Sequence, residues 1–256
     1  MKVVILAGGL GTRLAEETEV RPKPMIEIGG RPILWHIMKH YSCFGFKEFF
    51  IALGYKGEMI KHYFIDYYSL NCNLSIDLSN GQVNPVKRES EDWIVHLMDT
   101  GQNVNTGGRV RNLKPWLKDS TFMVTYGDGV SNINLQELLK FHKSHGKIGT
   151  VSAVRPPARF GGLLFDGDMV TKFTEKPQSG EGWINGGYLV FEPGIFDYLD
   201  GDESSLEAHA LERLAVDKQL FAYRHPDFWQ CMDTLRDKKY LEGLWDENRA
   251  PWKVWE

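Results

Sequence analysis

The sequence has few cysteines, no marked excess of one charge and no long apolar run. Its three cysteines, Cys43, Cys72 and Cys231, follow no metal-binding or redox spacing, so we expect reduced thiols in a cytoplasmic protein. Thirty basic and thirty-four acidic side chains give a net charge of −4, which excludes a basic field for nucleic acid or for an anionic membrane. Every apolar run ends well short of the roughly 20 residues of a membrane span. No secretory signal is expected.

Side chains that can build a core are plentiful. The 256 residues include 8 Trp, 10 Tyr and 14 Phe, which excludes a disordered chain. No linker rich in proline or serine, internal repeat or low-complexity segment interrupts the chain. The sequence therefore predicts a single domain over 1–256, with a core over 1–154 that residues 155–256 extend.

The first half of the chain alternates strand-like and helical patterns. Strands are predicted over 3–6, 48–53, 121–125 and 149–154, and helices over 32–41, 58–68, 107–117 and 135–142. This order predicts an α/β fold, with a Rossmann-like, mostly parallel sheet between helices. Strand-like segments at 159–162, 169–173 and 184–191 then predict an antiparallel extension. A helix over 206–217, a strand over 219–223 and a helix over 235–245 complete the chain.

A glycine-rich motif, LAGGLGTRL over 6–14, directly follows the first predicted strand. Gly8, Gly9 and Gly11 let backbone N–H groups approach a ligand, and such donors at the carboxyl end of a strand cradle phosphate oxygens. Arg13 adds a bidentate donor. Lys23 lies between two prolines, so we expect an extended backbone that cannot join a helix. These residues predict a polyphosphate site.

Two related glycine motifs do not fit this segment. A dinucleotide fingerprint needs a glycine where Leu14 stands, and a P-loop needs a Gly-Lys-Ser/Thr tripeptide that the sequence lacks. A tight turn without a ligand remains the alternative.

An aspartate flanked by glycines, Asp128, follows another apolar strand in the segment TYGDG. A carboxylate there projects at the carboxyl edge of the sheet, and Mg²⁺ is typically held by one carboxylate together with substrate phosphates. The alternative is a plain Asp-Gly turn. Asp233 is the candidate partner, although on its own it is better explained as the N-cap of the following helix, a place for which Thr234 competes.

Other polar segments in the second half suit a sugar phosphate. Glu175 and Lys176 offer a carboxylate and a cation, while Asn185 and Gly186 offer an amide and bare backbone. Each would also fit a strand edge or a turn when taken singly.

Histidine and tryptophan do not by themselves indicate a site. His142 and His145 share one helix face without a third ligand, so we expect a solvated pair and not a zinc site. The tryptophans of the C-terminal part are expected in a core or a subunit interface. These are Trp229, Trp245, Trp252 and Trp255.

Together the motifs resemble the nucleotidyltransferases that activate sugar 1-phosphates, and within that family the glucose-1-phosphate cytidylyltransferase branch. The resemblance covers the whole chain and rests on LAGGLGTRL (6–14), RPKPM (21–25), GGRPILWHIMK (29–39), GYKG (54–57), DTG (99–101), TGGR (106–109), TYGDG (125–129), RFGGL (159–163), EKP (175–177), INGG (184–187), FWQCMDTLRDK (228–238) and APWKVWE (250–256). The glycine-rich loop, the lysine and the strand-end aspartate mark the family. The segments TGGR, FWQ-x-MDTLRDK and WK-x-WE narrow it to the cytidylyl branch.

The resemblance implies specific roles for residues of this chain. It implies Mg²⁺ held by Asp128 and Asp233, and catalytic roles for these two together with Arg13 and Lys23. The implied nucleotide-binding residues are Leu6, Ala7, Gly8, Gly9, Gly11, Thr12, Arg13, Lys23, Thr106, Gly107, Gly108, Arg109, Gly127 and Asp128. The implied sugar-phosphate-binding residues are Gly129, Glu175, Lys176, Asn185 and Gly186. Residues 1–154 would then be the nucleotide-binding core, and 155–256 the part for sugar-phosphate binding and oligomerisation.

The implied reaction is in-line transfer of a cytidylyl group from CTP to α-D-glucose 1-phosphate, giving CDP-glucose and pyrophosphate. CDP-glucose would supply deoxyhexoses for the O-antigen of lipopolysaccharide and related surface polysaccharides. The resemblance also implies a homo-oligomer, with a hexamer as one form, and Trp252 and Trp255 are expected to pack on a neighbouring subunit. Transfer with another nucleotide or another phosphorylated acceptor is one alternative, and a non-catalytic nucleotide-sugar sensor is another.

Two segments depart from the family pattern. His209-Ala210-Leu211 stands where the family has Glu-Pro-Leu, a change that bears on the local loop and on sugar choice. Arg21 replaces a lysine and conserves the charge but not the donor geometry.

Overall fold

The computed structural model describes residues 1–11, 14–88, 91–156, 162–166, 169–174 and 182–255. A seven-stranded sheet lies at its centre, in the order β14-β10-β13-β8-β1-β4-β7. These strands are Leu220–His225 (β14), Gly149–Val154 (β10), Ile184–Phe191 (β13), Phe122–Tyr126 (β8), Lys2–Leu6 (β1), Glu48–Leu53 (β4) and Ile94–Asp99 (β7). All run parallel except β13, which is antiparallel to both of its neighbours. The predicted mostly parallel α/β fold is confirmed.

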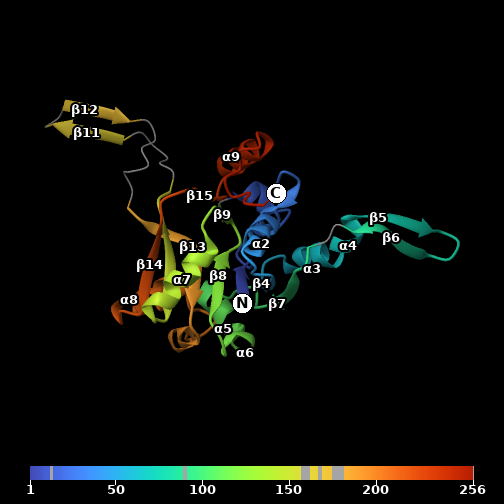
Figure 1. The fold of residues 1–256 in the computed structure, drawn as a ribbon, viewed down its shortest axis with the longest axis horizontal. Helices are drawn as coiled ribbons and strands as arrows, with labels where there is room; N and C mark the ends of the chain where they lie inside the picture. Colours follow the sequence, from blue (N-terminus) through green and yellow to red (C-terminus); the bar gives the residue numbers. More distant parts are fainter. Residues whose placement is uncertain (12–13, 89–90, 157–161, 167–168, 175–181, 256) are drawn as a thin grey trace.

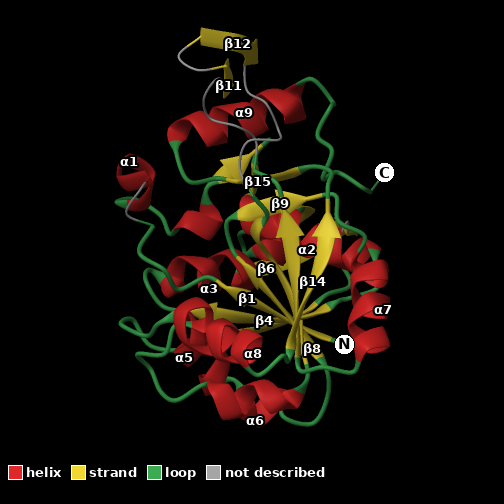
Figure 2. Ribbon diagram, turned by 90° about the vertical axis from the view of Figure 1, so that its left-hand side faces the viewer, coloured by secondary structure: helices red, strands yellow, loops and turns green. Residues whose placement is uncertain are grey.

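Alternating residues of the central strands bury two separate cores. Val3 and Ile5 of β1 pack with the helices Ile33–Cys43 (α2), Leu135–His145 (α7) and Leu235–Asp246 (α9). Val4 and Leu6 face the opposite layer, built from Thr106–Asn112 (α5), Lys114–Leu117 (α6), Pro193–Tyr198 (η3), Leu206–Leu211 (η4) and Glu212–Val216 (α8). A strand buried on both faces reads as a continuous apolar run, which is the pattern of residues 3–6. Figure 2 shows the strands fanning out between the two helical layers.

Shorter elements connect these layers. They are Ala15–Thr18 (α1), the 3-10 turn Lys23–Met25 (η2), Glu27–Ile28 (β2), Arg31–Pro32 (β3), Gly57–Ile65 (α3), Tyr67–Leu70 (α4), Gly129–Ser131 (β9) and Trp229–Cys231 (β15). Two hairpins, Cys72–Asp77 (β5) with Gln82–Arg88 (β6) and Gly162–Asp166 (β11) with Met169–Thr174 (β12), project from the body of the molecule (Figure 1). Among the described residues, no helix combines the length and the apolar character needed to cross a membrane.

Several predicted elements differ in detail. The helix expected over 58–68 is broken at Asp66, and the helix over 107–117 is broken at Leu113, just before Pro115. The helix over 206–217 begins as a π-helix and continues as α8. The expected antiparallel extension is only partly correct, because β13 lies inside the central sheet while β11 and β12 form a separate hairpin.

The C-terminal tail packs on the chain's own core. Trp252 is completely buried and donates a hydrogen bond from Nε1 to Nδ1 of His36 at 3.3 Å. Trp255 stacks edge-on against Trp35 of α2. The expectation that Trp252 packs on a neighbouring subunit is therefore wrong, since a site in its own chain already buries the ring.

Of the histidine pair on α7, His142 is buried and His145 is half-buried. His142 is 1% exposed; its Nδ1 lies 2.8 Å from the Thr150 hydroxyl and its Nε2 lies 3.2 Å from Glu192. His145 bonds the same hydroxyl through Nε2 at 2.7 Å. The expectation of a solvated pair is therefore wrong for His142, whereas the half-buried His145 keeps part of its surface exposed and shares the Thr150 hydroxyl.

Candidate active site

The glycine-rich loop and the segment after β8 meet at the carboxyl edge of the sheet. Leu6 and Tyr126 are paired neighbours on β1 and β8, and the Gly127 N–H donates to the Leu6 carbonyl at 3.1 Å. A Cβ on Gly127 would lie only 2.8 Å from that carbonyl oxygen, so the close approach of the two segments requires glycine.

A cavity of about 620 Å³ opens where these segments meet. Twelve of the predicted site residues line it: Leu6, Ala7, Gly8, Gly9, Gly11, Lys23, Thr106, Arg109, Gly127, Asp128, Asn185 and Asp233. Its lining also includes Pro24, Val104, Asn105, Tyr126, Trp229 and Cys231, which were not predicted as site residues. The described residues predicted for the polyphosphate and for the metal therefore share one cavity with Asn185, one of the residues predicted for the sugar phosphate.

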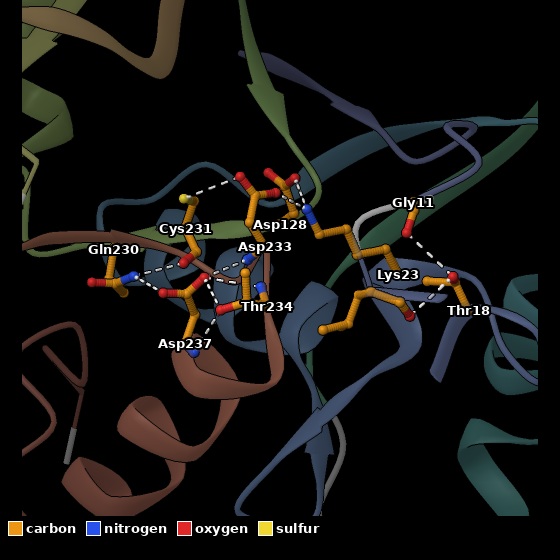
Figure 3. A network of polar contacts seen from close by, with 10 residues as sticks. Gly11, Thr18, Lys23, Asp128, Gln230, Cys231, Asp233, Thr234 and Asp237 are labelled. Atoms are coloured by element: carbon orange, nitrogen blue, oxygen red, sulfur yellow. Dashed lines mark hydrogen bonds and ion pairs between the residues drawn. The ribbon is translucent and has the colours of Figure 1, made fainter. Parts of the chain in front are cut away.

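Lys23 joins the two predicted metal ligands. Its ammonium lies 2.6 Å from Oδ2 of Asp128 and 2.5 Å from Oδ1 of Asp233 (Figure 3). Burial alone would lower the pKa of this ammonium, but the two carboxylates outweigh that effect and raise its pKa above the ordinary value. The side chain therefore stays charged.

The backbone of Lys23 differs from the prediction. Pro22 is extended, but Lys23 itself begins the single 3-10 turn η2 with Pro24 as its second residue, so the expectation that it cannot join a helix is wrong. Proline is tolerated in a first turn, where its missing N–H has no helical partner in any case. The turn still fixes the lysine backbone in place.

The strand pair β9 and β15 brings the two aspartates together. These strands are antiparallel, and the Met232 N–H donates to the Asp128 carbonyl at 2.8 Å as the next rung of the ladder. Asp233 follows directly. Residues that are 105 positions apart in the sequence thus reach one cation.

Thr234, and not Asp233, caps helix α9. The Thr234 hydroxyl accepts from the Asp237 N–H at 3.2 Å, and the Asp237 carboxylate accepts in return from the Thr234 N–H at 2.9 Å. This reciprocal pair is a capping box. Because Thr234 and Asp237 form the capping box, Asp233 does not cap the helix, and its carboxylate bonds Lys23 at the cavity. The interpretation of Asp233 as the N-cap is wrong.

Arg109 holds the cavity wall in place from behind. Arg109 is 4% exposed, and its guanidinium donates to the carbonyls of Gly8 and Leu53, each at 2.9 Å. It also donates to the Thr100 hydroxyl and the Gly101 carbonyl, each at 2.7 Å. A Cβ on Gly8 would lie 2.2 Å from Nη1 of Arg109, so this arrangement requires a glycine there. The bonds of Arg109 connect the glycine-rich loop to β4 and to the segment before α5.

The other predicted glycines lie behind the lining. Gly107 and Gly108 pack against residues 202–206, where a Cβ would come within 2.7 Å and 2.6 Å of the Ser204 and Asp202 carbonyls. Gly129 pairs with Cys231 in the β9–β15 ladder, and the Gly186 carbonyl accepts from Nε1 of Trp229 at 2.7 Å. All four glycines therefore pack beside the cavity without lining it.

Four predicted residues lie outside the described part of the chain. They are Thr12, Arg13, Glu175 and Lys176.

The two departures from the family pattern lie away from the lining. Arg21 forms ion pairs on the surface with Glu17 and Glu27, at 3.9 Å and 3.4 Å. His209 accepts the Ser205 N–H at 3.0 Å and so satisfies a backbone donor at the start of η4. Glu207, two positions before His209, was missed by sequence reasoning. It contacts the lining residues Thr106 and Tyr126 across 101 and 81 positions of sequence, and no local pattern extends that far.

The residues present fit a divalent cation. Two carboxylates already converge on one positive group, the Lys23 ammonium, at an open cavity next to backbone donors for phosphate. Within the described ranges no group of three or more Asp, Glu, His or Cys side chains could hold a metal alone. A pair of carboxylates supplemented by substrate phosphates and water is the environment in which Mg²⁺ is usually held.

Comparison with known proteins agrees with the fold and the motifs. The sequence profile described as Nucleotidyl transferase matches residues 2–243. The glucose-1-phosphate cytidylyltransferase of Salmonella typhi is 49% identical over 257 residues, and the probable glucose-1-phosphate cytidylyltransferase of Bacillus subtilis is 43% identical over 256 residues. Both alignments cover 100% of this chain and 100% of the relative.

Among solved structures, HddC from Yersinia pseudotuberculosis in complex with GMP-PN is similar to this chain. The TM-score is 0.67 and the sequence identity is 25%, over 95% of this chain and 99% of that one. The chain belongs to the nucleotidyl transferase family.

Proposed function

We propose that the protein transfers a cytidylyl group from CTP to α-D-glucose 1-phosphate, with CDP-glucose and pyrophosphate as products. The observation that carries this proposal is the convergence of Asp128 and Asp233 on Lys23 beside the glycine-rich loop. Full-length relatives at 49% and 43% identity that are named for this reaction support the choice of substrates.

The reaction needs no protein nucleophile. A phosphate oxygen of glucose 1-phosphate attacks the α-phosphorus of CTP, and the bond from that phosphorus to the bridging oxygen breaks as pyrophosphate leaves. Both substrates are polyanions, so alignment and charge neutralisation are the main tasks of the protein. Backbone N–H groups of the loop that contains Gly8, Gly9 and Gly11 would bind phosphate oxygens of CTP at the end of β1.

Asp128 and Asp233 would hold Mg²⁺, which supplies neutralisation of phosphate charge when bound. Lys23 would then donate to phosphate oxygens in place of the carboxylates. Arg13 would bind the departing pyrophosphate together with Lys23, and Thr106 and Arg109 would frame the nucleotide. Glu175, Lys176, Asn185 and Gly186 would meet the sugar phosphate. We expect the cytoplasm as the location and a homo-oligomer as the assembly.

Pyrophosphate release tests this function and its alternatives. The assay combines the protein and Mg²⁺ with each of CTP, UTP, dTTP, GTP and ATP, and with glucose, mannose and galactose 1-phosphates. The expected result is release with CTP and glucose 1-phosphate at a kcat/KM at least tenfold above every other pair, and no release with excess chelator. A different preferred pair would assign another transferase activity. Tight binding of CDP-glucose without any release would assign a sensor.

A further inference from the structure

A carboxylate lies directly behind one wall of the cavity. Glu207 of η4 is half-buried and accepts hydrogen bonds from three hydroxyl groups: Tyr126 at 2.5 Å, Thr106 at 2.7 Å and Ser205 at 2.8 Å. Tyr126 and Thr106 line the cavity, whereas Glu207 itself is not part of the lining. Glu207 therefore contacts the wall through other side chains.

The hydrogen bonds of Glu207 determine which groups donate and which accept in the next hydrogen bonds along the cavity wall. Because the Tyr126 hydroxyl gives its hydrogen to Glu207, its oxygen accepts from Nδ2 of Asn185, at 3.1 Å. The Asn185 oxygen accepts from the Gly187 N–H at 2.8 Å, so the orientation of this amide is set on both sides. Among the described residues, the Asn185 amide donates only to Tyr126, so its second Nδ2 hydrogen can bond a ligand in the cavity.

Packing and charge keep this chain of bonds in one arrangement. Gly187 has a φ of +77°, and a Cβ there would lie 2.4 Å from the Tyr126 ring, so the ring packs directly on backbone. Burial would raise the pKa of the Glu207 carboxyl, but the hydroxyl donors outweigh it and hold the pKa below its ordinary value. The carboxylate is thus ionised, and an ionised carboxylate can only accept.

We propose that Glu207 is a positioning residue for the acceptor substrate, acting through the Tyr126 hydroxyl to fix the Asn185 amide as a donor to the sugar phosphate. This inference rests on the proposed function. Without the charge on Glu207, the Tyr126 hydroxyl could turn to other acceptors and the Asn185 amide would lose its fixed orientation. The cost should fall mainly on binding of the sugar phosphate.

A double-mutant cycle tests the route through Tyr126. Glu207→Ala, Tyr126→Phe and the double variant are compared with wild type by steady-state kinetics for both substrates. Each single variant is expected to raise KM for glucose 1-phosphate about tenfold, and the double variant to raise it no further, because both changes break the same chain. Tyr126→Phe is expected to leave KM for CTP within threefold of wild type. Glu207→Gln, which keeps the shape and one acceptor, is expected to fall between wild type and Glu207→Ala.

Ser205→Ala is the matched control. Ser205 bonds the same carboxylate and also accepts from the Ala208 N–H at 3.1 Å, but it does not line the cavity. If Glu207 only anchored η4, then Ser205→Ala and Glu207→Ala would shift the melting temperature and the kinetics together. We expect Ser205→Ala to lower the melting temperature while KM for glucose 1-phosphate stays within threefold of wild type.

Several results would overturn the inference. Multiplicative effects in the double variant would show that Glu207 does not act through Tyr126, and an unchanged KM for glucose 1-phosphate in Glu207→Ala would remove its role. Failure of the proposed function is separate, because wild-type protein would then release no pyrophosphate. In that case the same cycle is read from the calorimetric dissociation constant of glucose 1-phosphate, and equal binding by all four proteins contradicts the inference.

Discussion

At the scale of single residues, charge placement dominates the site. Two aspartates in one small region would repel each other, and in the structure the Lys23 ammonium separates them by bonding both. The same three groups suit a reaction between polyanions. The place between the two carboxylates can hold a positive charge either from the Lys23 ammonium or from a metal ion bound from solution. Lys23 bonds both carboxylates in the structure, and under the proposed function it would also neutralise phosphate charge during turnover.

Lys23→Ala is expected to lower kcat by about 100-fold or more, because it removes a preorganised cation that meets charge formed in the transition state. The measurement is pyrophosphate release at saturating CTP, glucose 1-phosphate and Mg²⁺. Lys140→Ala, which changes a 78% exposed lysine on α7, serves as the control and should behave as wild type. A Lys23→Ala variant within tenfold of wild type would remove Lys23 from this role.

His36 gives the stability of the fold a pH dependence. Burial lowers the pKa of His36 to about 4, and its neutral ring donates to the Ile28 carbonyl while accepting from Trp252. The unfolded chain takes up a proton near the ordinary pKa, but the native ring does not. The free energy of unfolding should therefore fall as the pH drops from about 6.5 towards 4. This single group should account for about 2 kcal/mol between pH 7.5 and pH 5.

Urea unfolding at the two pH values checks this contribution. His36→Gln removes the titrating ring, so the difference in unfolding free energy between pH 7.5 and pH 5 should shrink by about 2 kcal/mol relative to wild type. An unchanged difference would show that His36 does not carry it.

At the scale of elements, the start of α9 connects helix stability with the metal site. The Asp237 carboxylate of the capping box also accepts from the Asp233 N–H at 3.1 Å and from Nε2 of Gln230 at 3.2 Å. The start of α9 therefore fixes the backbone on both sides of Asp233, the second of the proposed metal ligands. A change in the cap should affect the chemistry as well as the fold.

Thr234→Ala is expected to cost about 1 kcal/mol of unfolding free energy and to lower kcat/KM, because Asp233 loses its fixed backbone. Asn134→Ala provides the matched control, since the Asn134 side chain caps α7 through the Gln136 and Glu137 N–H groups, both at 3.1 Å. It should cost a similar free energy without an effect on kcat/KM. Equal kinetic effects of the two changes would contradict a special role for the α9 cap.

The sequence predicted helices and strands best where a single pattern of apolar residues extends over the whole segment. Residues 3–6 and 49–53 are apolar on both faces of a buried strand, and α2 has a regular apolar face. The hairpin of β5 and β6 was missed because its residues are mostly polar and exposed, and because Pro85 interrupts the strand pattern. The position of β13 between β8 and β10 could not be predicted, since periodicity gives the strands but not their order.

The residues of the candidate site likewise divide into those with a local sequence signal and those that only the folded structure brings together. The glycine-rich loop, Lys23 and Asp128 each carry a local signal, so their composition and spacing predicted a phosphate and metal site. Asp233 needed the resemblance, because its partner residues are more than 100 positions away. Glu207 could not be found from the sequence, because its contacts to Thr106 and Tyr126 arise only from tertiary packing.

At the scale of the whole molecule, the C-terminal tail closes one core. Trp252 packs beside Phe228 and Trp245, and through His36 it contacts α2 near the start of the chain. The last residues therefore stabilise the layer of helices that supports β1. This makes the tail part of the fold of each subunit, whatever the assembly.

Trp252→Ala is expected to lower the free energy of unfolding by about 3–5 kcal/mol, as for other buried aromatic rings. The loss should be the same at low and high protein concentration in a denaturant titration, because the ring is buried within one chain. A loss that grows on dilution would instead indicate that Trp252 stabilises contacts between subunits.

In the proposed reaction, two aspartates distant in sequence, Asp128 and Asp233, hold the cation that permits transfer between two phosphorylated substrates. Pyrophosphate release from CTP and glucose 1-phosphate, measured over a Mg²⁺ titration for wild type, Asp128→Asn and Asp233→Asn, tests it most directly. Each variant is expected to lose at least about 100-fold in kcat/KM, and chelator is expected to abolish wild-type turnover. Turnover in either variant within tenfold of wild type, at the same Mg²⁺ concentration, would contradict it.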